Sequence, residues 1–305
     1  MTVDSPQRNE ITVLMSTYNG EKYLQEQIDS ILGQQDVHVH LLVRDDGSTD
    51  HTLNILEDYQ EKGLLSFYTG ENLGPQRSFL HLLQHAPESD YYAFADQDDV
   101  WMDDKLISGI ESISTHADRP ALYFSQTLLV DENLQPMPSI IIHPLLTFGE
   151  MLIYKFIGGC TMIMNHALRT TVGSYVPSRM PMHDLWIYSI AVATDAFIFF
   201  DPNPHILYRQ HGNNTVGQGQ GFIYEWSQRL KRFFSQNNER YIQAQELANG
   251  YLQVMSPRNA AILQLFLEGK KSLRKRIAII KSHELRCANR TTQWLFWLNV
   301  IFNKY

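Results

Sequence analysis

Three carboxylates lie within four residues at the point where an apolar stretch of the chain ends. Residues 91–95 have the composition of a buried strand, and Asp96, Asp98 and Asp99 follow almost directly. On an extended backbone, Asp96 and Asp98 would project to the same face. Like charges repel unless a cation or strong donors neutralise them, and magnesium or manganese typically binds one or two carboxylates plus substrate phosphates. The segment therefore predicts a hard-metal site, and the alternative is a solvated acidic turn.

The carboxylate segment follows the fourth of four short strands that the sequence predicts. The apolar stretches alternate with helical patterns and lie at residues 11–15, 39–43, 64–68 and 91–95. This alternation indicates βαβ units and a parallel sheet, whose ligands bind at the carboxyl ends of the strands. Polar residues follow the first, second and fourth strands, at 17–19, 45–46 and 96–99. We therefore expect one polar ligand site at this edge of the sheet.

Local signals predict where several helices begin and which elements follow. Ser48 or Thr49 is a plausible N-cap for the second helix, and Gly74 with Pro75 opens the third. The later chain reads as further helices and strands separated by a proline-containing loop. The expected helices are 105–116 and 183–194, the strands 121–130, 161–164 and 196–200, and the loop 131–144.

The overall composition is that of an ordinary globular protein. Of the 305 residues, 44% are hydrophobic and 19% are charged. Two cysteines far apart, Cys160 and Cys287, argue against a disulfide framework and favour a reducing cytoplasm. The first ten residues lack the apolar core of a signal peptide, and no apolar run reaches the length of about 20 that a membrane-spanning helix needs.

The charge is distributed unevenly along the chain. Residues 1–221 contain 11 Lys and Arg against 28 Asp and Glu, whereas residues 222–305 contain 14 against 5. This change predicts a flexible tail at 1–10, an α/β domain at 11–221 and a basic helical region at 222–305. The basic run at 270–276 and the aromatic run at 294–302 suit a surface of anionic lipid. Equally, these helices could pack their apolar face on the core.

With these motifs in place, the sequence resembles a family 2 glycosyltransferase of the GT-A fold. The match covers roughly residues 11–215, in the order and spacing of the family, and the variant is most similar to bacterial rhamnosyltransferase-like members that build cell-surface polysaccharides. The matching segments are STYNG at 16–20, DDGSTD at 45–50, NLG at 72–74, DQDDVW at 96–101, HDLW at 183–186 and YRQHGNN at 208–214.

The resemblance implies a Rossmann-like, mostly parallel α/β sheet flanked by helices, and an inverting transfer of a sugar from a nucleotide diphosphate donor. It implies that Asp45 reads the pyrimidine and that Asp96 lies by the ribose. Asp98 would hold a Mn²⁺ or Mg²⁺ ion that bridges the phosphates, with His211 facing it. The full set of implied nucleotide-sugar-binding residues is Thr17, Tyr18, Asn19, Glu21, Asp45, Arg77, Asp96 and Gln97.

The same resemblance implies that Asp184 is the catalytic base. The family usually has Glu before it, and His183 stands there in this chain. A carboxylate at the start of a helix is stabilised in its ionised form by the helix dipole. The alternative is that Asp184 is only an N-cap. His183, Trp186 and Gly159 are candidates for contact with the acceptor, and Trp186 could instead fill the core.

The expected function is metal-dependent transfer of L-rhamnose from dTDP-rhamnose to a saccharide or lipid-linked saccharide, on the cytoplasmic face of the membrane. UDP-sugars are the alternative donors. A sugar-nucleotide nucleotidylyltransferase would need a Gly-rich loop with basic residues after the first strand, and residues 16–20 lack it. A non-catalytic carbohydrate-binding homologue is a further alternative, and no nucleic-acid partner is expected.

Overall fold

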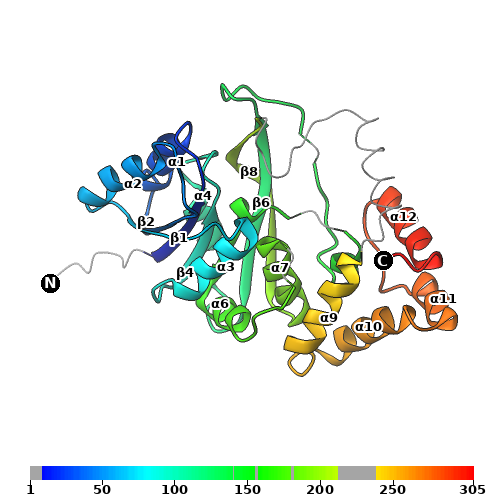
Figure 1. Cartoon of the computed structure of the whole chain (residues 1–305). Helices are drawn as coiled ribbons and strands as arrows, with labels where there is room; N and C mark the ends of the chain where they lie inside the picture. Colours follow the sequence, from blue (N-terminus) through cyan, green and yellow to red (C-terminus); the bar gives the residue numbers. More distant parts are fainter. Residues whose placement is uncertain (1–8, 140, 155–156, 180–181, 212–237) are drawn as a thin grey trace. The chain divides into compact units, whose positions relative to one another are not determined.

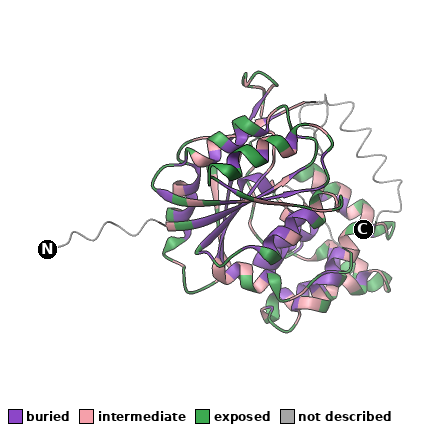
Figure 2. Ribbon diagram, turned by 60° about the vertical axis from the view of Figure 1, so that its left-hand side comes forward, coloured by how far each residue is buried: buried purple, intermediate pink, exposed green. Residues whose placement is uncertain are grey.

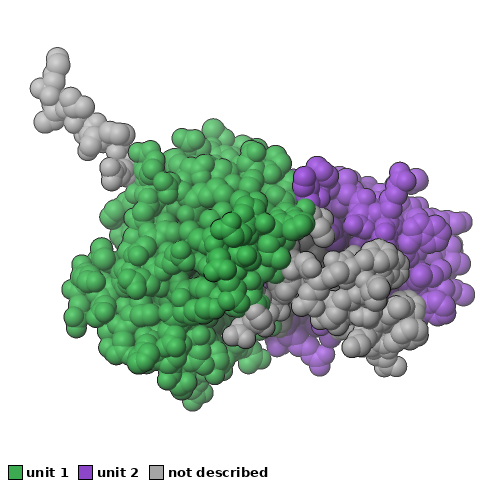
Figure 3. Space-filling model, turned by 90° about the horizontal axis from the view of Figure 1, so that it is seen from above, with its two compact units in different colours: residues 1–140, 158–173, 197–214 green, residues 141–157, 174–196, 215–305 purple. Residues whose placement is uncertain are grey.

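The computed structural model describes residues 9–139, 141–154, 157–179, 182–211 and 238–305 (Figure 1). The chain divides into two compact units, each of three segments (Figure 3). Unit 1 comprises residues 1–140, 158–173 and 197–214, and unit 2 comprises residues 141–157, 174–196 and 215–305. The expected boundary near residue 221 lies outside the described residues, as do residues 1–8 of the expected tail.

Within the described residues, unit 1 contains one eight-stranded sheet in the order β3-β2-β1-β4-β7-β6-β8-β5. The pairs β1–β2, β2–β3, β1–β4 and β6–β8 are parallel, whereas β7 runs antiparallel to both of its neighbours and β5 antiparallel to β8. The expected α/β class with a mostly parallel sheet is therefore confirmed. The strands are β1 (Asn9–Thr17), β2 (Val37–Asp45), β3 (Ser66–Thr69), β4 (Tyr91–Ala95), β5 (Val100–Trp101), β6 (Ala121–Val130), β7 (Ile163–Asn165) and β8 (Phe197–Arg209).

Helices cover both faces of this sheet, and the buried residues are concentrated on the strands (Figure 2). One face packs against α1 (Leu24–Leu32), α2 (Thr52–Glu61) and α4 (Lys105–Ser114), the other against α3 (Pro75–His85) and α6 (His166–Gly173). Ile11, Val13 and Met15 all point into the first layer, because alternate residues of a strand share a face. Both faces of β1 and β4 are covered, which explains their continuous apolar sequences.

The start of α3 follows the sequence prediction, and the start of α2 does not. Gly74 adopts φ +72°, a conformation that favours glycine, and Pro75 occupies the first turn. The N-cap of α2 is His51 rather than Ser48 or Thr49, and its side chain makes no capping bond. The predicted caps are wrong because Ser48 and Thr49 hydrogen-bond to the loop after β1 instead.

Two later elements also differ from the sequence prediction. The segment expected as a strand at 161–164 begins with a 3-10 turn, Gly159–Thr161, and only β7 is extended. The strand expected at 196–200 continues as β8 to Arg209, pairing with β6 across two register shifts. β8 therefore brings residues 206–209, which are far from the first strands in sequence, into the same sheet.

Unit 2 is helical in its described part. It contains α5 (Phe148–Ile153), α7 (His183–Ala193), α9 (Glu239–Tyr251), α10 (Pro257–Gly269), α11 (Leu273–Lys281) and α12 (Arg290–Ile301). Helix α7 is buried around nearly its whole circumference, and α5 and α9 pack against it. None of the helices in the described part of the chain combines the length and apolar character required to span a membrane.

Candidate active site

The carboxylate of Asp45 fixes the turn that follows β2. It is fully buried and accepts four hydrogen bonds. Thr17 Oγ1 and Ser48 Oγ donate to Oδ2 at 3.0 and 2.5 Å, and the main-chain N–H groups of Gly47 and Ser48 donate to Oδ1 at 3.0 and 2.9 Å. An ionised carboxylate offers about four acceptor positions. Asp45 therefore organises the loop, and a direct bond to a pyrimidine would require one of these donors to move away.

The loop after β1 is joined to the loop after β2 by reciprocal hydrogen bonds. The N–H of Asn19 donates to Ser48 Oγ at 2.9 Å, and the N–H of Thr49 donates to Asn19 Oδ1 at 2.8 Å. Asn19 adopts φ +48°, a left-handed conformation that asparagine tolerates better than most residues. Glu21 Oε2 accepts from the N–H of His51 at 2.8 Å. Asn19 and Glu21 thus hold the two loops together.

The loop after β4 is tied to the same edge by one side chain. Gln97 Oε1 accepts from the N–H of Tyr18 at 2.9 Å, and Gln97 Nε2 donates to the carbonyl of Tyr18 at 3.1 Å. The Tyr18 ring is 49% exposed, so it remains free to stack on a flat ligand. The structure therefore brings together Thr17, Tyr18, Asn19, Glu21 and Gln97 at the carboxyl ends of β1, β2 and β4.

Asp98 and His211, the predicted metal-binding residues, also lie at this edge. The backbone bends at residues 97–98, so the expectation that Asp96 and Asp98 share a face of an extended strand is wrong. Asp98 Oδ2 instead lies 2.8 Å from His211 Nε2, and the His211 ring lies at a tilt of 35° to the ring of Tyr23, with 5.1 Å between the ring centres. The Asp98–His211 contact brings together a carboxylate oxygen and an imidazole nitrogen, two ligand types that could hold a manganese ion.

Negative charge accumulates beneath this pair. Ligand atoms of Asp96, Asp99 and Cys160 lie within 4.8 Å of one another. Asp99 is fully buried, and burial together with the charges of Asp96 and Asp98 raises its pKa well above the usual range. Burial also lowers the pKa of Lys105 to about 7, and its Nζ lies 3.5 Å over the Trp101 ring. Like charges held this closely favour a bound cation, so the residues fit a divalent metal.

Arg209, to which the sequence analysis gave no role, anchors the carboxylate segment. The residue is only 2% exposed. Its N–H donates to Asp99 Oδ1 at 3.0 Å, its Nε to the main-chain oxygen of Asp98 at 2.9 Å and an Nη to the main-chain oxygen of Glu132 at 2.7 Å. The other Nη bonds Glu26 Oε2 at 2.5 Å. A buried arginine with this many partners fixes the position of the segment that carries Asp98. The available signal was its position in the YRQHGNN motif at 208–214, two residues before His211.

A second buried arginine, Arg44, is the last residue but one of β2. Arg44 and Asp46 form an ion pair and are each 3% exposed. Arg44 also donates to Ser78 Oγ at 3.2 Å, and Asp46 Oδ2 accepts from the N–H of Leu73 at 3.1 Å. These contacts hold the chain before α3, whose first turn carries the exposed Arg77. The first turn of α3, and with it the backbone of Arg77, is therefore held in place at the edge of the sheet where the ligand is expected.

In unit 2, Asp184 lies in the first turn of α7 and is half-buried. The N-cap of this helix is Met182, so the alternative that Asp184 is an N-cap is wrong. The neighbouring His183 is 4% exposed, and burial lowers its pKa to about 4. Its imidazole is therefore neutral at physiological pH.

All three of the expected acceptor contacts, His183, Trp186 and Gly159, are buried. Trp186 is 0% exposed and packs in unit 2 against Tyr175 and Tyr251, at ring distances of 6.4 and 6.0 Å. It therefore fills the core, and its assignment to the acceptor surface is wrong. Gly159 is buried in the 3-10 turn of unit 1, and its lack of a side chain leaves only its backbone for any contact.

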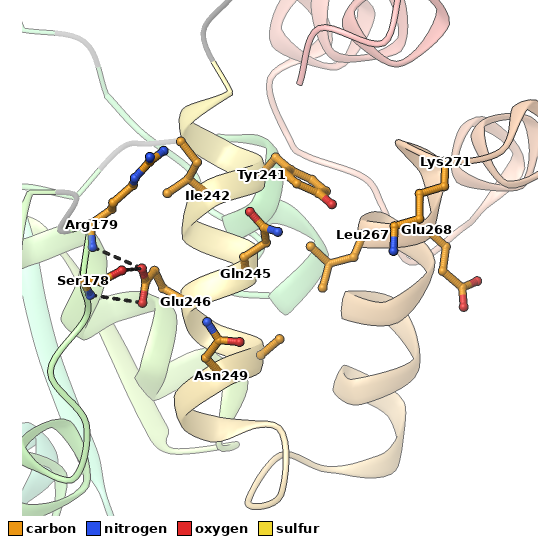
Figure 4. Close-up of a pocket in the computed structure, with 11 residues that line it drawn as sticks. Ser178, Arg179, Tyr241, Ile242, Gln245, Glu246, Asn249, Leu267, Glu268 and Lys271 are labelled. Carbon is orange, nitrogen blue, oxygen red and sulfur yellow. Dashed lines mark hydrogen bonds between the residues drawn. The ribbon is translucent and has the colours of Figure 1, made fainter.

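Unit 2 also contains a cavity of about 510 Å³ between α9 and α10 that the sequence did not indicate (Figure 4). Glu246 forms one wall, and its carboxylate accepts hydrogen bonds from Tyr175 Oη, from the N–H and Oγ of Ser178 and from the N–H of Arg179. Gln245 also lines the cavity, and its amide could donate to and accept from ligand hydroxyl groups. The remaining lining residues are Tyr241, Ile242, Ala248, Asn249, Leu267, Glu268 and Lys271.

Known proteins resemble this chain in both sequence and fold. A dTDP-rhamnosyl transferase, RfbG, of Shigella flexneri is 29% identical over 231 residues, covering 68% of this chain and 75% of the relative. A putative teichuronic acid biosynthesis glycosyltransferase, TuaG, of Bacillus subtilis is 29% identical over 230 residues, covering 72% and 89%.

Among solved structures, TarS residues 1–349 of S. aureus in complex with UDP-GlcNAc superimposes with a TM-score of 0.60 at 19% identity, covering 96% of this chain and 80% of that one. The mannosyltransferase PcManGT of Pyrobaculum calidifontis, in complex with GDP-Man and Mn²⁺, gives 0.52 at 16% identity, covering 97% and 86%. These likenesses support the GT-A fold.

Residues 12–167, just over half of the chain, match the profile of glycosyl transferase family 2. This match decides against the nucleotidylyltransferase alternative and agrees with the edge built by β1, β2 and β4. The chain is a glycosyltransferase and belongs to glycosyl transferase family 2.

Proposed function

We propose that the enzyme transfers L-rhamnose from dTDP-rhamnose, with inversion, to a saccharide acceptor in the synthesis of a cell-surface polysaccharide. The observation that carries this proposal is the joining of three loops at one sheet edge, with Asp98 and His211 in contact beside them. The donor assignment is supported by the dTDP-rhamnosyl transferase relative. A UDP-sugar is the second candidate, since the motifs suit either pyrimidine nucleotide.

The donor would lie along the loop edge of unit 1. Tyr18 offers an exposed ring beside the loops that Asn19 and Glu21 hold closed. Asp45 keeps the turn after β2 in shape, and Asp96 is assigned to the ribose hydroxyls, which can donate to its carboxylate. Arg77 can supply a positive charge to the diphosphate from the first turn of α3.

A divalent cation, Mn²⁺ or Mg²⁺, is assigned to Asp98 and His211. When bound, it would neutralise the charge that develops on the departing diphosphate. The chain's own contribution is to hold these ligands in place. Arg209 supports the main chain of Asp98, and the Tyr23 ring lies against the His211 ring. The buried carboxyl group of Asp99 accepts from the main-chain N–H of Arg209 and so helps to hold this segment.

Asp184 is assigned as the general base. The acceptor hydroxyl oxygen would attack the anomeric carbon from the face opposite the nucleotide, forming the new glycosidic bond. The bond between that carbon and the diphosphate oxygen breaks, and its electron pair leaves with the diphosphate. The hydroxyl proton passes to the carboxylate of Asp184, and attack from the opposite face inverts the anomeric centre. General-base help of this kind contributes about 10²–10⁴-fold in rate.

We further assign the exposed apolar stripe of α11 and α12 to contact with an anionic membrane that carries a lipid-linked acceptor. Trp294, Leu298 and Phe302 recur at helical spacing and are 65%, 38% and 59% exposed, and α11 adds Leu273 and Ile277. Exposed patches of this kind mark interaction sites, and tryptophan beside basic residues suits a lipid headgroup layer. The exposed basic residues of the same helices are Arg274, Lys275, Lys281 and Arg290.

The opposite side of the same helices is buried. Ile279 of α11 and Phe296 and Val300 of α12 are 0% exposed, and Phe296 stacks on Phe266 of α10 at 6.2 Å. The sequence left open whether these helices pack on a core or face a membrane. The buried side accounts for the packing, and the exposed stripe supports the membrane assignment.

A panel of nucleotide sugars tests the donor proposal. Melting temperatures are measured with dTDP-rhamnose, UDP-GlcNAc and GDP-mannose, each with and without Mn²⁺. A ligand at about 100 times its Kd stabilises a protein by about 2.7 kcal/mol. We expect dTDP-rhamnose with Mn²⁺ to give the largest shift. A shift with UDP-GlcNAc alone would replace the proposed donor, and no shift with any nucleotide sugar would contradict the site.

Vesicle sedimentation tests the membrane assignment. The double variant Trp294→Gln/Phe302→Gln should pellet less than wild type with anionic phosphatidylglycerol vesicles. Val254→Gln is the control, because Val254 is 63% exposed but lies outside α11 and α12. Equal pelleting of all three proteins would remove the stripe from this role.

A further inference from the structure

Three metal-ligating side chains meet at the amino ends of β1 and β2. Glu10 pairs directly with His38 in the parallel register, and His40 follows two residues later on the same face. Glu10 Oε1 lies 3.4 Å from His38 Nδ1, and Glu10 Oε2 lies 3.3 Å from His40 Nε2. The two imidazole rings are 4.6 Å apart, and ligand atoms of all three residues lie within 4.8 Å of one another.

We propose that Glu10, His38 and His40 form a binding site for a transition-metal ion of the Zn²⁺, Ni²⁺ or Cu²⁺ class. Two ligands of one such ion, each bonded at about 2.1 Å, can be at most about 4.2 Å apart. The observed separations therefore need only small side-chain rotations to reach coordination distance. The three side chains are 53%, 57% and 47% exposed, which leaves them free to rotate and leaves room for water in the remaining positions.

The strand geometry makes this arrangement more than a chance surface pair. Residues two apart on a strand point the same way, so the His-X-His spacing of 38 and 40 places both imidazoles on one side. The neighbouring strand supplies the carboxylate at the matching register position. Because β1 and β2 are fixed by a continuous ladder from Asn9 to Thr17, the backbone positions are set before any ion binds.

The ligand set differs from that of the donor site, and so does its preferred metal. Two imidazoles and one carboxylate favour Zn²⁺, Ni²⁺ or Cu²⁺, whereas the carboxylate-rich segment around Asp98 suits Mg²⁺ or Mn²⁺. Glu10 also lies seven residues before Thr17 along β1, about 23 Å at the usual rise of a strand. An ion here would link the two strands at the edge opposite the donor loops, without touching them.

Zinc titration of the intact chain tests the site. Calorimetry with ZnCl₂ is carried out in excess Mg²⁺, so that the carboxylate site is already filled. The double variant His38→Ala/His40→Ala is compared with wild type and with His283→Ala, which removes an exposed histidine elsewhere. We expect wild type and His283→Ala to bind one more zinc ion per chain than the double variant. Glu10→Gln should weaken this site by at least the roughly 10–100-fold that loss of an outer-shell partner costs.

Two further measurements make the result decisive. All variants should melt at the wild-type temperature in EDTA, because the replaced side chains are exposed and the fold does not depend on them. Affinity at the site should rise from Mn²⁺ through Zn²⁺ to Cu²⁺. Equal zinc stoichiometry and affinity in wild type and the double variant would overturn the proposal, and so would a wild-type chain that binds no zinc beyond the level of the double variant.

Discussion

Replacing Arg209 by lysine should loosen the segment that carries the metal-binding carboxylate. Lysine keeps the positive charge but replaces a planar fork with a single ammonium group. The Arg209 side chain donates to the main-chain oxygens of Asp98 and Glu132 and to the carboxylate of Glu26. These acceptors lie around different edges of the guanidinium, so an ammonium group cannot satisfy them all.

The expected loss follows from the number and burial of these partners. A lysine that keeps one carbonyl bond leaves the other carbonyl without its donor, at about 1–3 kcal/mol. The pair with Glu26 adds little, because Glu26 is 51% exposed and such pairs are screened to about 0–1 kcal/mol. A domain of 150–250 residues loses about 2–4 °C per kcal/mol, so the melting temperature should fall by roughly 2–12 °C.

Arg258→Lys is the matched control. Arg258 also bonds a glutamate, Glu284, at 2.6 Å, but its side chain is 70% exposed. Thermal unfolding of both variants and calorimetry with dTDP-rhamnose and Mn²⁺ are measured on the same preparations. We expect Arg209→Lys to melt lower and bind donor more weakly, with Arg258→Lys like wild type within about 0.5 kcal/mol. If both variants match wild type in stability and donor affinity, Arg209 does not anchor the site.

Three more changes probe the separate parts of the enzyme. Asp98→Asn should lose Mn²⁺-dependent donor binding, measured by calorimetry, and unchanged binding would remove Asp98 from the metal site. Asp184→Asn should keep its melting temperature and donor affinity while transfer falls by about 10²–10⁴-fold; full transfer activity would exclude it as the base.

Lys105→Met should remove a pH dependence of stability. The pKa of Lys105 is about 7 in the folded protein and about 10.4 when unfolded, so between these values the unfolded chain binds the extra proton and wild-type stability rises with pH relative to the variant. Urea unfolding at pH 7 and pH 9.5 gives the free energy of unfolding of both proteins. If the difference in this free energy between wild type and the variant is the same at both pH values, the reasoning is contradicted.

The elements with strong local signals could be predicted from the sequence. Residues 91–95 and 121–130 are predicted as strands and form β4 and β6 with the same bounds. Residues 91–95 lack any charged or small polar side chain, which suits a strand covered on both faces. In β6, apolar residues lie on either side of the polar stretch 125–127. Gly74 and Pro75 mark the start of α3. Glycine permits a positive φ and proline fixes its own φ, whatever the rest of the chain does. Such features depend on neighbouring residues alone.

The features that the sequence did not reveal depend on distant partners. Arg209 meets Asp99 across 110 positions, and no local pattern distinguishes an anchoring arginine from a surface one. Likewise, Asp45 is saturated partly by Thr17, 28 positions earlier. The antiparallel insertion of β7 between β4 and β6 is a matter of topology, because a three-residue strand carries no signal of its direction.

The chain passes back and forth between the two units, so the parts of unit 2 are made at different times during synthesis. Unit 1 is complete in its described strands when Arg209 has been made, whereas α5 and α7 of unit 2 then still lack α9, α10 and α12. A ribosome adds about 5–20 residues per second, so roughly 5–20 s pass between Arg209 and Tyr305. During this interval the apolar side chains of α7, buried in the finished protein, have no helical partner from the last segment. These side chains therefore wait for residues 239–301 before their helical partners exist, and no single break in the chain separates the two units intact.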